Sequence, residues 1–174
     1  MLNDIEQGIS GLLECRGAQD ASSIGVGLVT CDSREVVPGA LFVAVRGFLT
    51  DGHRYIAGAV TSGAVAVVCE EFPQECLPNV RYLLVKDART ALADVARIFY
   101  GDASGKLMII GVTGTNGKTT TSRLIASMLN AAGIPAGYIG TGLCRIGDEE
   151  IELDRTTPES HGLQALFRRM LDAG

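Results

Sequence analysis

Tryptophan is absent from the 174-residue sequence, and histidine occurs only twice. The five cysteines are scattered, odd in number and never spaced as Cys-x-x-Cys; they are Cys15, Cys31, Cys69, Cys76 and Cys144. Zinc sites need closely spaced cysteine and histidine ligands, and disulfide frameworks need paired cysteines. We therefore expect neither, and we expect the thiols to be reduced in a reducing compartment.

Positive charge and long apolar runs are also scarce. Lys and Arg total 15 against 20 Asp and Glu, a formal net charge of −5, whereas a nucleic-acid surface needs clustered positive charge. No apolar run approaches the ~20 residues needed to span a bilayer. The first residues include Asp4 and Glu6, where a secretory signal would be basic. We expect a cytoplasmic protein with no nucleic-acid and no membrane partner.

The most informative stretch that is present runs from Leu107 to Thr120. Its apolar start predicts a strand, its glycines at 111, 114 and 117 predict a loop, and Lys118-Thr119 opens a predicted helix with Gly133 as its stop. The apolar face of this helix is Leu124, Ile125, Met128 and Leu129. Glycines let successive backbone N–H groups turn toward an anion, and a helix N-terminus adds its positive dipole end. The stretch predicts a phosphate-binding loop.

The loop departs from the strict G-x-x-x-x-G-K-[ST] pattern, because Val112 stands where the first glycine would be. An ordinary glycine-rich turn with a surface lysine is the alternative. The apolar run before the loop and Lys118-Thr119 after it favour a mononucleotide site.

The sequence Gly114-Thr115-Asn116-Gly117-Lys118-Thr119-Thr120 resembles the ATP loop of the Mur ligases. Three further stretches agree with this resemblance: Asp32-Ser33-Arg34 with Pro38 to Ala44, Asp51-Gly52-His53, and Thr156-Thr157-Pro158 preceded by Ile139-Gly140-Thr141. The similarity runs from about residue 25 to the end. Because full-length members are far longer, we expect an N-terminal fragment.

The resemblance implies an ATP-dependent, amide-bond-forming ligase of peptidoglycan precursor synthesis. The third stretch is similar to the member that adds the third amino acid, meso-diaminopimelate or L-lysine, to UDP-MurNAc-L-Ala-D-Glu through an acyl phosphate. ATP and Mg²⁺ are the implied cofactors, and the two substrates are the implied partners. The fragment alone is expected to be inactive.

The resemblance also assigns residues to the nucleotide. The ATP contacts are Gly114, Thr115, Asn116, Gly117, Lys118, Thr119 and Thr120. Lys118 is the catalytic candidate, since such a lysine reaches the outer phosphates and the next hydroxyl can ligate Mg²⁺. Thr119 is therefore one metal candidate. The resemblance implies Asp154 as the other, because relatives carry an acidic magnesium ligand two residues before the first threonine, although Asp154 also fits a solvated loop aspartate.

For the UDP-linked substrate, the resemblance assigns Ser33, Thr50, Thr156 and Thr157. All of them except Thr156 have a plainer alternative or a weaker basis. Asp32-Ser33-Arg34 could be a local turn, Thr50 is transferred by its position after Phe48-Leu49 alone, and Thr157 with Pro158 is typical of a helix start. His53 fits a capping or packing histidine as well as a ligand, and it receives no catalytic role.

The expected fold class is α/β, with a mixed-sheet N-terminal UDP-substrate domain over residues 1–104 and the start of a phosphate-loop, mostly parallel-sheet ATPase domain over residues 105–174. The periodicity predicts helices over 4–16, 55–62 and 88–100, and a last helix capped by Thr157. Strands are expected over 25–30, 40–45, 64–69, 82–85 and 136–140, with a hairpin around 146–151. Residues 101–106 are the expected linker.

Three rivals stay open. The ligase that adds D-Ala-D-Ala shares Asp-Ser-Arg and the phosphate loop, but Thr-Thr-Pro argues against it. A phosphate-loop kinase or NTPase would lack the Asp-Ser-Arg domain, and a non-catalytic UDP-sugar or nucleotide-binding module belongs to a different class. We also expect that apolar surface on the second domain could support self-association.

Overall fold

The protein is described by a computed structural model that covers residues 2–47, 50–153 and 157–174. The chain forms two compact units, Met1–Phe99 and Tyr100–Gly174. No helix within the described ranges is both long and apolar enough to cross a membrane.

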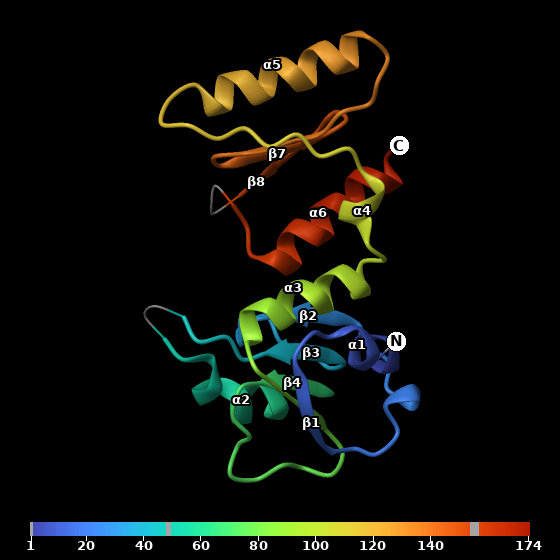
Figure 1. The fold of residues 1–174 in the computed structure, drawn as a ribbon, viewed down its shortest axis with the longest axis vertical. Helices are drawn as coiled ribbons and strands as arrows, with labels where there is room; N and C mark the ends of the chain where they lie inside the picture. The colour runs from blue at the N-terminus through green and yellow to red at the C-terminus, as the bar shows by residue number, and fades with distance from the viewer. Residues whose placement is uncertain (1, 48–49, 154–156) are drawn as a thin grey trace. The chain divides into compact units, whose positions relative to one another are not determined.

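The first unit contains a five-stranded mixed sheet (Figure 1). Its strands are β1 (Leu12–Gly17), β2 (Leu28–Thr30), β3 (Ala40–Val43), β4 (Ala66–Cys69) and β5 (Arg81–Val85), in the order β1-β5-β4-β3-β2. The last four are parallel to one another, and β1 runs antiparallel to β5. The expected α/β fold with a mixed sheet is confirmed for this unit.

Helices cover both faces of this sheet. Helices α1 (Leu2–Gly8) and α3 (Ala88–Phe99) pack on one face, against Leu41, Val43 and Leu83 among others. Helix α2 (Ile56–Thr61), which continues the short 3₁₀ helix η2 (Gly52–Tyr55), packs on the other face with Phe42 and Tyr82. A second 3₁₀ helix, η1, spans Ala21–Ser23. Alternate residues of each central strand thus face two separate apolar cores, as a sheet buried on both sides requires.

Local signals in the sequence explain two of these elements. The Asp87 carboxylate accepts the N–H of Thr90 at 2.8 Å and caps α3, whose Leu92, Val95 and Ala96 are fully buried as their spacing predicts. Pro38-Gly39 is a local turn signal, and a turn forms here: the N–H of Ala40 donates to the carbonyl of Val37 at 3.0 Å.

The helix predicted over residues 4–16 is wrong beyond its first turns. Helix α1 ends at Gly8, and Leu12–Gly17 forms the edge strand β1. Gly11 lies in the left-handed region with φ 71°, and the N–H of Ser10 bonds to Asp94 Oδ2 at 2.8 Å. Pairing with the exposed edge of β5 therefore outweighed the helical spacing of Leu12 and Leu13, which local pattern alone could not show.

The second unit contains α4 (Ala103–Lys106), α5 (Lys118–Ala131), β6 (Tyr138–Gly140), β7 (Leu143–Ile146), β8 (Glu149–Glu152) and α6 (Ser160–Asp172). Strands β6, β7 and β8 form an antiparallel sheet in that order. The hairpin expected around residue 148 is confirmed, as is the end of α5 before Gly133, whose N–H donates to Asn130 O at 3.0 Å. Part of the expected linker forms the single turn α4.

The apolar run before the phosphate loop does not form the predicted strand. Met108 is 93% exposed, and Ile109 and Ile110 are about half exposed. A strand persists only beside a hydrogen-bonded neighbour, and the described part of this unit pairs its strands antiparallel without this run. The parallel pairing expected here is therefore not seen among the described residues.

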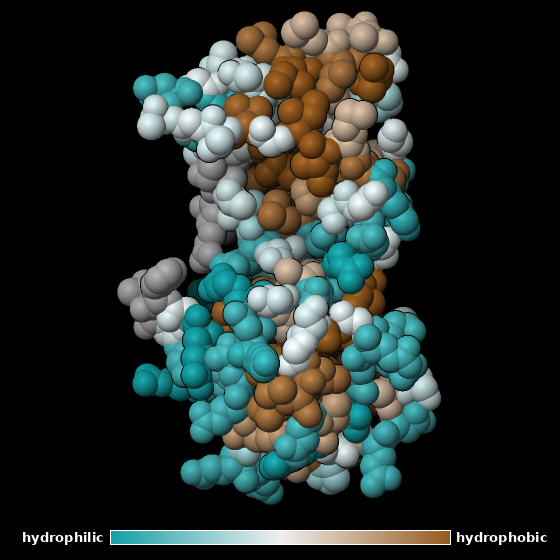
Figure 2. All heavy atoms as spheres, viewed as in Figure 1, coloured by the Kyte–Doolittle hydropathy of each residue, from teal (hydrophilic) through white to brown (hydrophobic). Residues whose placement is uncertain are grey.

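The core of the second unit is small. It centres on Cys144, Ile146 and Leu166, with Met170 packed against them. Helix α5 contributes no buried residue, and its Leu124 and Met128 are 58% and 70% exposed. Residues of high hydropathy lie together on the face of this unit that Figure 2 shows. The amphipathic helix α5 therefore forms, but the other described elements of its unit leave its apolar face exposed.

Candidate functional sites

The first candidate site lies at the carboxyl ends of the parallel strands in the first unit. Asp32-Ser33-Arg34 follows β2, Arg46-Gly47 and Thr50-Asp51 follow β3, and Glu70 follows β4. Because parallel strands end at the same edge of their sheet, the topology brings these segments to one edge. Ligands of open α/β sheets bind at this edge.

Asp32 is held in a tight local turn. Its Oδ1 accepts the backbone N–H of Arg34 at 2.9 Å, and its own N–H donates to the hydroxyl of Thr30 at 3.0 Å. The Thr30 hydroxyl, fully buried at the end of β2, donates in turn to Glu35 Oε2 at 2.7 Å. The turn alternative thus holds for Asp32, which shapes the loop through its side chain.

Ser33 and Arg34 are placed differently from Asp32. Within the described residues the Ser33 hydroxyl has no hydrogen-bond partner, so the local turn does not occupy it. The Arg34 guanidinium pairs with the Asp32 carboxylate, which raises the pKa of Arg34 above its usual value, and its side chain is 87% exposed. A hydroxyl and a cation therefore lie at this edge of the sheet, and both are donor types that suit a diphosphate.

Thr50 is exposed after β3, and its carbonyl accepts the N–H of Gly47 at 2.9 Å. The other residues of the predicted nucleotide loop, Phe48 and Leu49, lie outside the described residues. The structure therefore brings Thr50 to the same sheet edge as Ser33.

His53 is a structural residue, which the sequence left open. Its Nδ1 lies 2.7 Å from Asp51 Oδ1, and its Nε2 accepts the backbone N–H of Glu70 at 2.9 Å. The Asp-x-His spacing could have indicated the first contact, since Asp51 caps η2 by accepting the His53 N–H. Glu70, 17 positions away, could not be found from local spacing.

The second candidate site is the loop that enters α5. Gly114 and Gly117 have φ of 147° and 77°, values that side-chain-bearing residues rarely adopt. Gly117 is the N-cap, and the N–H of Thr121 donates to its carbonyl at 2.9 Å. Two of the three predicted glycines thus occupy the backbone conformations of the turn that only glycine readily adopts. Helix α5 begins at Lys118, as predicted.

The first turn of α5 is suited to an anion. It contains no acidic residue and no side chain caps it, so its N–H groups are left for a ligand. The Lys118 ammonium donates to the carbonyl of Gly114 at 2.5 Å, across the mouth of the loop. Thr115, Asn116, Thr119 and Thr120 are exposed. Backbone N–H groups, a cation and hydroxyls, the groups that a phosphate site requires, lie together here.

The predicted cap of the last helix is wrong. Helix α6 begins at Ser160, and its N-cap is Glu159, whose ψ of 162° is extended. The first helical bond runs from Leu163 N–H to Glu159 O at 3.0 Å, so Thr157 lies before the helix. Thr157 is exposed, and its hydroxyl has no partner within the described ranges. The other predicted residues of this segment, Asp154 and Thr156, lie outside the described residues.

Within the described residues, no metal cluster competes with these sites, and the thiol of Cys69 is unsuited to react. Among residues 2–47, 50–153 and 157–174, no three His, Cys, Asp or Glu side chains gather as a metal site. Burial raises the pKa of Cys69 to about 12, which makes this thiol a poor nucleophile at neutral pH.

Two profiles of one family match the chain. Residues 26–100 match the profile described as "Mur ligase family, catalytic domain", and residues 112–174 match "Mur ligase middle domain". The chain is 60% identical over 173 residues to a Chlorobaculum tepidum protein named UDP-N-acetylmuramoyl-L-alanyl-D-glutamate--2,6-diaminopimelate ligase, covering 99% of this chain and 34% of the relative. A Geobacter metallireducens protein of the same name is 42% identical, covering 100% and 32%.

Solved structures give the same picture of the fold. A structure titled with the same ligase name aligns with a TM-score of 0.68 at 24% identity, covering 93% of this chain and 32% of that one. A MurF from Acinetobacter baumannii aligns with a TM-score of 0.62 at 20% identity, covering 97% and 32%. The chain therefore spans about a third of the length of the proteins it matches.

Proposed function

The chain belongs to the Mur ligase family, and on this premise we propose that it is part of an ATP-dependent ligase of peptidoglycan precursor synthesis. The ligase adds the third amino acid to UDP-MurNAc-L-Ala-D-Glu. The observation that carries the proposal is the 60% identity, over 99% of the chain, with a relative named for this reaction. We assign residues 1–104 to the UDP-substrate domain and residues 105–174 to the first part of the ATP-binding domain.

In this reaction ATP transfers its γ-phosphoryl group to the side-chain carboxylate of D-glutamate, which leaves ADP and an acyl phosphate. The amine of the diamino acid attacks the acyl carbon, phosphate leaves, the amine loses a proton and an amide forms. The names of the relatives favour 2,6-diaminopimelate over L-lysine as the amine. We place the reaction in the cytoplasm, where ATP is supplied.

Lys118 and the first turn of α5 carry the ATP part of the proposal. The ammonium, now on the Gly114 carbonyl, turns to the outer phosphates and offsets their charge. The N–H groups of residues 117–120 donate to no side-chain cap, and they donate instead to the phosphate oxygens. Phosphoryl transfer depends mainly on such positioning and charge neutralisation.

Mg²⁺ fits the residues at this loop. The exposed Thr119 hydroxyl offers the oxygen ligand that the ion accepts beside substrate phosphates, and we propose Asp154 as a further ligand. When bound, the ion neutralises charge on the phosphates. Ser33, Thr50, Thr156 and Thr157 are proposed contacts of the UDP-linked substrate, and the hydroxyls of Ser33 and Thr157 have no partner in the described part of the chain.

Calorimetric titration of the 174-residue chain tests the proposal. UDP-MurNAc-L-Ala-D-Glu and ATP with Mg²⁺ should each bind once, and prior saturation with one should not abolish binding of the other. A kinase or NTPase would bind ATP alone, and a UDP-sugar module would bind the UDP compound alone. Either result contradicts the proposal.

Amide formation by the chain alone is expected to be undetectable. Holding both reactants and the catalytic groups in place can supply roughly 7–11 kcal/mol, and the chain spans about a third of its relatives. Tripeptide formed from ATP, Mg²⁺, UDP-MurNAc-L-Ala-D-Glu and diaminopimelate at ~1 per second or more would contradict this expectation.

A further inference from the structure

The segment between β3 and η2 is a loop closed tightly at its base. The N–H of Gly47 donates to Thr50 O at 2.9 Å, and the N–H of Gly52 donates to Val45 O at 3.0 Å. Arg46 and Asp51 form an antiparallel bridge between these two bonds. A Cβ on Gly52 would lie 2.7 Å from Val45 O and 2.8 Å from Val45 N, so the two arms meet only with glycine at this position. Thr50 is carried on this closed base.

His53 joins the loop base to β4. A backbone N–H can only donate, so the Nε2 that receives the Glu70 N–H must be an acceptor, and the ring proton sits on Nδ1 and is donated to Asp51. The His53 side chain is 13% exposed. One largely buried imidazole, in one tautomer, therefore connects Asp51 at the end of the loop to the first residue after β4.

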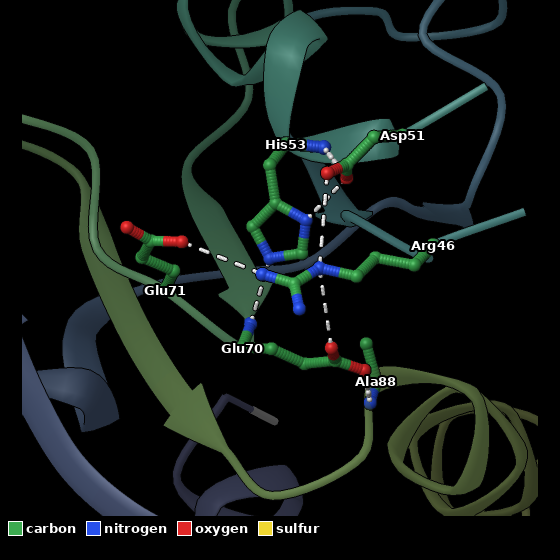
Figure 3. A network of polar contacts seen from close by, with 6 residues as sticks. All are labelled: Arg46, Asp51, His53, Glu70, Glu71 and Ala88. Carbon is green, nitrogen blue, oxygen red and sulfur yellow. Dashed lines mark hydrogen bonds and ion pairs between the residues drawn. The ribbon is translucent and has the colours of Figure 1, made fainter.

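Arg46 extends the connection from the other arm of the loop. Its Nε lies 3.7 Å from Asp51 Oδ2 and 3.5 Å from Glu70 Oε2, and its Nη2 lies 3.4 Å from Glu71 Oε2. Glu70 also accepts the N–H of Ala88 at 2.9 Å, at the start of α3. Figure 3 shows the guanidinium among these carboxylates. Both arms of the loop are thus tied to β4, and through Glu70 to α3.

The charges in this network argue against direct contact with a diphosphate. One guanidinium faces three carboxylates, and the imidazole is neutral in the tautomer above, so negative charge is in excess by two. Such a cluster repels an anion. The polar groups of the network are also engaged with one another. Among the described residues of this loop, Thr50 is exposed and can meet a ligand.

We propose that His53, Asp51, Arg46 and Glu70 are positioning residues that fix the loop carrying Thr50 for the nucleotide portion of the UDP-linked substrate. The proposal rests on the proposed function. A loop that is fixed before binding loses less conformational entropy when the ligand arrives. Breaking the network therefore weakens substrate affinity while leaving the phosphate loop of the second unit unaffected.

Substitutions at His53 separate the two halves of its role. In the 174-residue chain, His53→Ala should weaken calorimetric binding of UDP-MurNAc-L-Ala-D-Glu about three- to tenfold, the range expected for lost hydrogen bonds. His53→Gln should restore most of the affinity, because its amide oxygen can reach the Glu70 N–H. His53→Asn is too short and should stay weak. ATP affinity should be unchanged in all three variants.

Two more variants keep the test decisive. Arg54→Ala, an exposed neighbour in η2, should bind like the wild type. Arg46→Gln changes a half-exposed side chain and keeps His53 in place. It should weaken substrate binding about two- to fivefold. If His53→Ala is poorly folded, Arg46→Gln decides the question. Thermal unfolding of each variant reports its folded fraction.

The outcomes distinguish the two proposals. Wild-type chain that does not bind UDP-MurNAc-L-Ala-D-Glu overturns the proposed function, and this inference falls with it. If the wild-type chain binds the substrate, and Arg46→Gln and folded His53→Ala bind it equally well, the positioning role alone is overturned. Equal loss of ATP and substrate affinity also overturns it, because that pattern indicates a general defect.

Discussion

The two units of this chain differ in how far their own elements cover their apolar residues. In the first unit, both faces of the sheet are packed, and Leu41 and Leu83 are fully buried. In the second, α5 has the periodicity and the stop signal of an amphipathic helix, yet Leu124 is 58% exposed. An amphipathic pattern thus predicts that a helix forms, whereas its burial depends on elements distant in the sequence.

The same substitution in each unit gives the largest expected contrast. Leu83→Ala removes a fully buried side chain from β5 and should cost about 2–5 kcal/mol of unfolding free energy. Leu124→Ala removes an exposed one and should change it by less than about 0.5 kcal/mol. Urea unfolding of the chain, followed by circular dichroism, measures both.

Comparable losses from the two variants would erase the contrast, because Leu124 would then be covered in solution. Self-association through α5 is the interpretation we would adopt in that case. Sedimentation at two protein concentrations measures the oligomeric state directly. A monomer with both losses equal would contradict the packing described for the second unit.

Lys118→Ala should give the next largest effect, on ligand binding and not on stability. Removing a charged hydrogen-bond partner of phosphate costs about 1.5–3 kcal/mol, so ATP affinity should fall about 10- to 150-fold. Lys118 is half-buried at the start of an uncovered helix, and alanine is tolerated there. Calorimetry with ATP and Mg²⁺ measures the change.

Lys106→Ala is the matched control, since Lys106 lies in the same unit and also donates to a backbone carbonyl, that of Gly101. It should leave ATP affinity unchanged. An unaltered affinity in Lys118→Ala, or an equal loss in both lysine variants, would argue against the phosphate-loop assignment.

What could be predicted from the sequence follows the same division between local and distant causes. Helix α3 was predicted because Asp87 and the spacing of Leu92 and Val95 are local. The strand β1 was missed because pairing with β5, about 70 residues away, decided it. The run before Gly111 was taken for a strand from its composition, and no described strand pairs with it.

The candidate sites divide in the same way. The geometry of the candidate phosphate loop could be predicted from the sequence because its glycines, lysine and helix are consecutive. Gly114 and Gly117 adopt the conformations that glycine alone readily allows. The network around His53 could not be predicted from the sequence, because Arg46, Glu70 and Ala88 come together only in the folded sheet. The cap of α6 was misplaced by two residues, since Thr-Pro-Glu fits a helix start at either position.

Ser33→Ala should have a smaller effect, confined to the first unit. A lost neutral hydrogen bond is worth about 0.5–1.5 kcal/mol, so the affinity for UDP-MurNAc-L-Ala-D-Glu should fall about two- to twelvefold. The affinity for ATP should stay the same. Ser62→Ala, at an exposed position before β4 and hence toward the amino ends of the strands, is the control and should bind normally. Ser33→Ala with unchanged substrate affinity would remove Ser33 from the site.

The smallest expected effect is a pH dependence at Asp51. Hydrogen bonds from the backbone N–H and the side chain of His53 hold the pKa of Asp51 below its usual value. A carboxyl whose pKa is lowered by folding stabilises the fold above its unfolded-state pKa, about 3.9, and loses this contribution as the pH falls through the folded value.

Asp51→Asn should therefore lower the urea midpoint at pH 7, and the difference from the wild type should shrink below about pH 4. The side chain is 39% exposed, so the effect should be modest. A difference that stays constant from pH 7 to pH 3 would show that the ionised carboxylate contributes nothing through its charge.

The most direct test of the central claim is a map of both ligands on the chain by amide chemical shifts. UDP-MurNAc-L-Ala-D-Glu should shift the amides of residues 32–34 and 46–53 in the first unit, with further shifts near Thr157. ATP with Mg²⁺ should shift residues 111–121 at the start of α5. Two separate sets of shifts, each present when the other ligand is bound, are the predicted result. A substrate that shifts no amide of the first unit, or two ligands that compete for one set of residues, would contradict the account.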